Sequence, residues 1–157
     1  GYNTRWGPEE TENSERFIEA HPRDPHPVRV LWATEATDRY NRAHWVVIDE
    51  LGPISGDGGR GALVGLTANG LGGAVDAIRD GNTVTVEAYH VRRLTVLISP
   101  DVFDMRSPIR VIANGEVAFE GMVRSSVETL GKWAASDEDR TMLYAGEITI
   151  ELEPDPE

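Results

Sequence analysis

The chain has no cysteine among its 157 residues, so thiol catalysis, cysteine-ligated zinc and disulfide bonds are all excluded. It also has no apolar run that approaches the ~20 residues of a membrane-spanning helix, and no basic-then-apolar signal peptide opens it. A chain of this length buries about 70% of its unfolded surface on folding, so it needs no disulfide bond or metal ion to fold. We therefore expect one domain, or one domain with an appendage, that is held together by an apolar core.

Basic residues are scarce, since 15 Lys and Arg stand against 27 Asp and Glu and the net charge is −12. Nucleic acids and anionic membranes bind to basic surfaces. Neither is therefore an expected partner, and the surplus of acidic residues predicts a well-solvated surface.

Catalytic motifs are also missing. None of the seven serines lies in the Gly-x-Ser-x-Gly turn that exposes a hydrolase nucleophile. Residues 56–61 match G-x-G-x-x-G, but Pro53 precedes them and further glycines follow, which favours a loop over a dinucleotide site. None of the four histidines forms an H-E-x-x-H zinc motif. The sequence therefore predicts no catalytic residue, no metal ligand and no cofactor.

Two acidic groups resemble sites but are predicted to be turns. Asp101 and Asp104 have the residue type of a glycosidase pair, yet they follow a Ser-Pro dipeptide, which favours turn capping. Residues 137–139 lack the glycine and the distal glutamate of a calcium loop. An enzyme that works through carboxylates alone is a further hypothesis, for which the sequence favours no pair.

Alternating apolar residues predict strands from residue 28 onward. The strongest signal is Asn114-Gly115 between two such runs, because a type I′ hairpin turn needs two residues that tolerate positive φ. Other strands are predicted at residues 28–34, 43–49, 75–79, 83–88, 91–99 and 148–152. The hairpin residues predicted to share the buried side of each strand are Ile109, Val111 and Ala113, then Val117, Phe119 and Val123.

Two segments have helical patterns. Residues 9–20 follow Pro8, which suits a first helical turn, and Glu12 and Arg16 form an i,i+4 pair. Such a helix is marginal alone, so we expect it to dock against something. Ser125 and Glu128 match a capping box for a second helix. Its predicted apolar stripe consists of Val127, Leu130 and Ala134.

These elements predict a mainly β fold, an antiparallel β-sandwich of immunoglobulin-like type with one interposed helix and an N-terminal helical segment. Residues 1–27 are predicted to be the N-terminal helix and a proline-rich linker. Residues 28–153 are predicted to be the sandwich, with a glycine-rich insertion at 52–74.

Aromatic residues are the only binding candidates. Trp32, Tyr40 and Trp45 gather in the first β unit, and Trp133 lies in the second helix. Exposed Trp and Tyr on a sandwich can stack on sugar rings, whereas a sandwich more often buries Trp in its core. The first three are therefore candidates for a ligand platform, and docking on a neighbouring domain is a third role open to them.

Residues 22–152 resemble the C-terminal immunoglobulin-like β-sandwich domain of bacterial α/β-hydrolases of the prolyl-oligopeptidase, esterase and polyester-depolymerase kind. Only the glycine-rich residues 52–74 depart from that pattern. The segments that carry the resemblance are residues 23–27, 40–45, 80–86, 93–100, 114–115 and 126–133.

The resemblance implies that residues 9–21 are the last helix of a hydrolase domain and that the catalytic domain lies before Gly1. The start without methionine points the same way. It further implies a non-catalytic accessory domain of an esterase or peptidase, a catalytic domain as partner in the same protein, and a secreted or periplasmic location. The alternative is a stand-alone module that binds a carbohydrate or another polymer.

Overall fold

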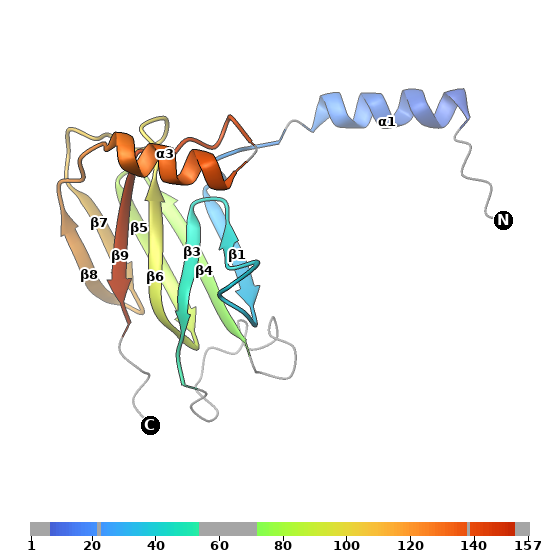
Figure 1. Ribbon diagram of the computed structural model, residues 1–157. Helices are drawn as coiled ribbons and strands as arrows, with labels where there is room; N and C mark the ends of the chain where they lie inside the picture. Colours follow the sequence, from blue (N-terminus) through green and yellow to red (C-terminus); the bar gives the residue numbers. More distant parts are fainter. Residues whose placement is uncertain (1–6, 22, 54–71, 138, 153–157) are drawn as a thin grey trace.

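A computed structural model of the chain describes residues 7–21, 23–53, 72–137 and 139–152. The helix α1 (Pro8–Ala20) projects away from a β-sandwich, as Figure 1 shows. The ion pair predicted in this helix is present, with Arg16 Nη2 3.1 Å from Glu12 Oε1. Residues 54–71, which make up most of the predicted insertion at 52–74, lie outside the described part of the chain, as does residue 153.

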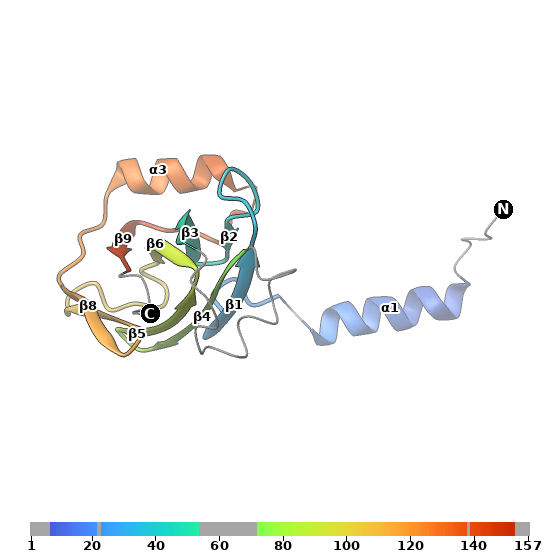
Figure 2. The same cartoon turned by 90° about the horizontal axis from the view of Figure 1, so that it is seen from below.

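Two sheets packed face to face form the sandwich (Figure 2). One sheet has five strands in the order β1-β4-β5-β7-β8, and the other has four in the order β2-β3-β6-β9. Neighbouring strands are antiparallel except β5 and β7, which run parallel. The predicted mainly β sandwich is confirmed. The strand bounds are Arg29–Thr34 for β1, Arg42–Ala43 for β2, Val46–Leu51 for β3, Gly73–Asp80 for β4, Thr83–Tyr89 for β5, Val91–Ile98 for β6, Ile109–Ala113 for β7, Glu116–Gly121 for β8 and Gly146–Glu151 for β9.

The core between the sheets is mostly aliphatic. A fully buried Leu, Ile or Val side chain contributes about 1.5–3 kcal/mol through its removal from water. Burial of the apolar side chains that alternate along the strands therefore stabilises the packing of the two sheets. Burial confirms the predicted inward side of β7, where Ile109, Val111 and Ala113 are buried. The largest side chains with less than 2% exposure include Trp45, Tyr144, Ile48, Leu94, Leu97, Ile98 and Ile109.

The predicted hairpin between β7 and β8 is confirmed. Asn114 has φ 54° and Gly115 has φ 88°, both positive as a type I′ turn requires. The hairpin between β4 and β5 is also present, with Gly81 at φ 55°. Local turn chemistry therefore sets both of these strand pairings.

The prediction that the return strand β8 buries Val117 is wrong, because that side chain is 49% exposed. Val111 pairs with Phe119, whereas its neighbour Ile112 pairs with Val117, so Ala118 is an extra residue in β8. A β-bulge of this kind breaks the alternation of faces. It turns Val117 to the outer side of the sheet and leaves Phe119 half-buried.

Helix α3 (Val127–Ser136) lies against the outer side of the four-stranded sheet (Figure 2). Its N-cap is Ser126, whose Oγ accepts a hydrogen bond from the Thr129 backbone N at 3.3 Å. The capping box predicted for Ser125 and Glu128 is therefore wrong by one residue. The chain stays extended through Ser126, with φ −127° and ψ 131°, so the helix begins one residue later.

Trp133 and Lys132 hold α3 to the sheet, the latter through an ion pair from its Nζ to Glu147 Oε2 at 2.9 Å. Trp133 makes the apolar contact. Its ring packs against the core and its Nε1 donates to Glu147 Oε2 on β9 at 2.8 Å. Of the predicted stripe, Leu130 and Ala134 are half-buried, whereas Val127 is 87% exposed and lies outside the contact. The helix thus covers one end of the sheet through a large aromatic side chain and an ion pair.

Candidate functional site

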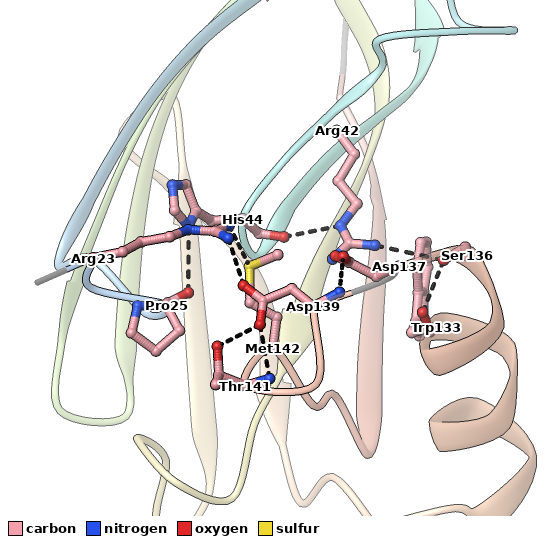
Figure 3. Close-up of polar contacts among 10 residues, drawn as sticks. All are labelled: Arg23, Pro25, Arg42, His44, Trp133, Ser136, Asp137, Asp139, Thr141 and Met142. Carbon is pink, nitrogen blue, oxygen red and sulfur yellow. Dashed lines mark hydrogen bonds and ion pairs between the residues drawn. The ribbon is translucent and has the colours of Figure 1, made fainter. Parts of the chain in front are cut away.

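A polar cleft of about 490 Å³ lies where the linker after α1 meets the sandwich, and Figure 3 shows the polar contacts among several of its side chains. Three segments far apart in the sequence meet there: the linker after α1, the loop that leads into β2, and the end of α3. We call it the entry cleft. Its lining residues are Arg23, Tyr40, Asn41, Arg42, His44, Ser136, Asp137 and Met142.

Arg42 organises one wall of the entry cleft. Its Nη2 lies 2.6 Å from Asp137 Oδ2, and the two side chains are 15% and 18% exposed. Its Nε donates to the carbonyl oxygen of His44 at 3.0 Å. Its guanidinium also lies 5.3 Å from the ring centroids of both Trp133 and Tyr144. One side chain therefore ties β2 to the end of α3 and to the segment before β9.

Arg23 forms the opposite wall through an ion pair with Asp139. Asp139 Oδ1 also accepts hydrogen bonds from the backbone N and the hydroxyl of Thr141, at 2.9 and 2.6 Å. The bonds from Thr141, together with the charge of Arg23, lower the pKa of the Asp139 carboxyl. This carboxylate therefore stays ionised and holds the linker at neutral pH.

The linker residues 23–27 are docked on the sandwich. The ring of His26 is 7% exposed. The indole Nε1 of Trp45 donates to the carbonyl oxygen of Pro27 at 2.8 Å, and His44 Nδ1 lies 3.3 Å from the carbonyl oxygen of Pro25. The sequence predicts a proline-rich linker here, and these contacts fix that linker to the sandwich as a strap.

Two buried polar groups face each other where the strap meets the sandwich. The rings of His26 and Tyr144 meet edge to face at 5.7 Å. Within the described part of the chain, neither the His26 ring nitrogens nor the Tyr144 hydroxyl has a hydrogen-bond partner, although Asp101 Oδ2 lies 3.9 Å from His26 Nε2. Burial lowers the pKa of His26 and raises the pKa of Tyr144 to about 12. Both groups are therefore neutral at pH 7.

The aromatic candidates fall in three different environments. Trp45 is 1% exposed and belongs to the core, so its ring presents no face to a ligand. Trp32 is half-buried, and its Nε1 donates to the carbonyl oxygen of Tyr40 at 2.9 Å. Tyr40 is 78% exposed and stands at the rim of the entry cleft. Only Tyr40 therefore offers an open ring.

The acidic groups that sequence reasoning assigned to turns have turn contacts. Asp104 accepts from the backbone N of Arg106 at 3.1 Å and from the hydroxyl of Ser107 at 2.8 Å, and these bonds, with that of Ser107 the strongest, lower its pKa. Asp137 Oδ1 accepts from the backbone N of Asp139 at 2.9 Å. Sequence reasoning missed Arg23 and Arg42, which pair with residues 116 and 95 positions away. No local signal marks such pairs.

No cluster of three or more His, Asp or Glu side chains suited to a metal occurs among the residues that the structure describes. No described helix is long and apolar enough to cross a membrane. No protein-family model matches the chain, and no curated protein and no solved structure matches it either. The relationship to hydrolase-associated domains therefore stays a resemblance of sequence segments.

Proposed function

We propose that the chain is a non-catalytic accessory domain of a larger serine hydrolase, an esterase or peptidase, and that it supports or shapes the catalytic domain. The observation that carries the proposal is the docked linker. Residues 23–27 are held to the sandwich by an ion pair, a buried ring and an indole hydrogen bond. A linker fixed to the sandwich in this way holds the start of the preceding segment at one position, whereas a flexible linker does not.

Helix α1 is the element that this strap presents. It has 13 residues, a length at which an isolated helix is marginal in water. Phe17 and Ile18 near its end are 63% and 66% exposed. A partner surface that covers these two side chains stabilises the helix and buries apolar area. We assign that surface to the catalytic domain of the same protein.

The chemistry of the described residues fits a supporting role. The arginines of the entry cleft are engaged in ion pairs with Asp137 and Asp139. The ring of His26 in the strap is buried against the sandwich, where it meets a tyrosine ring and not a nucleophile. These groups stabilise the junction between linker and sandwich.

The test uses the complete reading frame of the gene and the isolated chain in parallel. We expect the complete product to contain a hydrolase domain with a Gly-x-Ser-x-Gly turn and to cleave a chromogenic ester. The isolated chain should not cleave it. Substitution of Phe17 and Ile18 by alanine should lower the melting temperature of the catalytic domain, whereas Val127→Ala, at a side chain 87% exposed, should not.

Ester cleavage by the isolated chain, or a reading frame without a hydrolase domain, would overturn the proposal. The export of the complete protein to the periplasm or medium belongs to the same proposal, and cell fractionation checks it.

A further inference from the structure

Tyr40 has an unusual backbone for an exposed aromatic residue. Its φ is 54°, in the left-handed region that bulky side chains rarely adopt. The carbonyl oxygen of Tyr40 accepts a hydrogen bond from the indole Nε1 of Trp32 at 2.9 Å. Left-handed conformations of non-glycine residues persist where the surroundings fix them, and they gather at ligand sites. The chain therefore holds a strained backbone that places an open ring at the rim of the entry cleft.

The cleft beside this ring carries fixed hydrogen-bonding groups. The amide Nδ2 of Asn41 donates to the carbonyl oxygen of Ile48 at 3.3 Å, and Ser136 Oγ donates to the carbonyl oxygen of Trp133 at 2.9 Å. These side chains, with His44, line a hollow whose volume falls in the range of small-molecule sites. An oriented set of polar groups next to a flat apolar ring suits a ligand that is polar at its edges and apolar on its face.

The charges of the site indicate a neutral ligand. Arg42 is paired with Asp137 and Arg23 with Asp139, so each cation of the cleft already has its anion. The chain as a whole carries a net charge of −12, which repels anions. Among the lining residues that the structure describes, Met142 is the only apolar side chain that is not aromatic, which disfavours an acyl chain. A neutral sugar ring has polar edges and an apolar face and meets all of these conditions.

We propose that the entry cleft binds a neutral oligosaccharide, with the Tyr40 ring stacked on one sugar and the cleft side chains bonded to its hydroxyls. This binding site does not require a catalytic domain. The proposal of sugar binding can therefore be tested independently of the proposed accessory role.

The experiment titrates the 157-residue chain with soluble hexasaccharides of cellulose, xylan, mannan, chitin and starch, by calorimetry and by amide chemical shifts. We expect at least one to bind with a Kd on the order of 0.1–1 mM and to shift the amides of residues 40–44 and 136–137. Tyr40→Ala should weaken that binding about tenfold or more, and Tyr40→Phe should retain it.

Tyr40→Asn is a second loss variant, because asparagine tolerates positive φ and keeps the loop folded. Val127→Ala, at an exposed site on the far end of α3, is the matched control and should bind as the parent does. Failure of every neutral hexasaccharide to bind overturns the proposal, as does binding that Tyr40→Ala leaves unchanged. Binding of sulfated or uronic-acid polymers in place of neutral ones also overturns it.

Discussion

Replacement of Arg42 by methionine is predicted to destabilise the domain far more than replacement of an exposed arginine. Arg42 and Asp137 are 15% and 18% exposed, and the guanidinium also lies over two aromatic rings. Removal of one partner leaves a carboxylate largely cut off from water, which costs about 3–5 kcal/mol when burial is complete. With the remaining exposure, we expect a loss of about 3 kcal/mol in the free energy of unfolding.

Arg92→Met is the matched control. Arg92 pairs with Glu50 at 3.2 Å, but these side chains are 61% and 37% exposed. An exposed pair of this kind contributes about 0–1 kcal/mol. Comparison of the two variants therefore separates the value of the buried pair from the general effect of removing an arginine.

Urea unfolding followed by tryptophan fluorescence provides the measurement, with the slope against urea expected to stay constant. In a domain of this size the Arg42→Met loss corresponds to a fall in Tm of about 6–12 °C. A double-mutant cycle with Asp137→Asn should give a coupling energy of about 1.5 kcal/mol or more. A loss equal to that of Arg92→Met, or a coupling near zero, would refute the reasoning.

Three further predictions concern pH and backbone conformation. Burial lowers the pKa of His26 in the folded state, despite the nearby Asp101 carboxylate. The neutral His26 ring therefore contributes its full stability above about pH 6.5, and this contribution is lost as the pH falls below that value. The free energy of unfolding should fall from pH 7 to 5.5 for the parent and stay flatter for His26→Gln. Gly115→Ala should destabilise by about 1 kcal/mol, because φ is 88° there. Gly131→Ala should stabilise the domain by about 0.5–1 kcal/mol, because a Cβ added at this helical position meets nothing within 4 Å. Thermal melts in which both glycine substitutions change Tm in the same direction would contradict this account.

The parts of the fold that the sequence predicted are those set by local chemistry. Asn114-Gly115 specifies its turn through two positive φ angles, and the alternation in β7 marks its buried side. The exposure of Val117 was not predictable in this way, because a β-bulge arises from the pairing of two strands. The cap of α3 shifted by one residue for a related reason, since Ser126 also bonds through its backbone N to the carbonyl oxygen of Ala145 at 2.7 Å.

The candidate site was predictable only in part. Tyr40 was a candidate as an aromatic residue in the first β unit, and its exposure keeps it one, whereas Trp45 lies in the core. The two arginine pairs of the entry cleft join residues about a hundred positions apart, so no spacing in the sequence indicates them. The docking of the linker likewise depends on surfaces that exist only once the sandwich has formed.

The role proposed for the chain rests most directly on the docked linker, and the backbone dynamics of that linker test it. The amide order parameters of Asp24 and His26 in the 157-residue chain should match those of strand β6, about 0.85. The Asp24 side chain also accepts a hydrogen bond from the His26 backbone N at 2.9 Å, which holds both residues in place. Order parameters below about 0.6 at these two amides would show a free tether. They would contradict the account of a strap that fixes the position from which the chain leaves the sandwich toward α1.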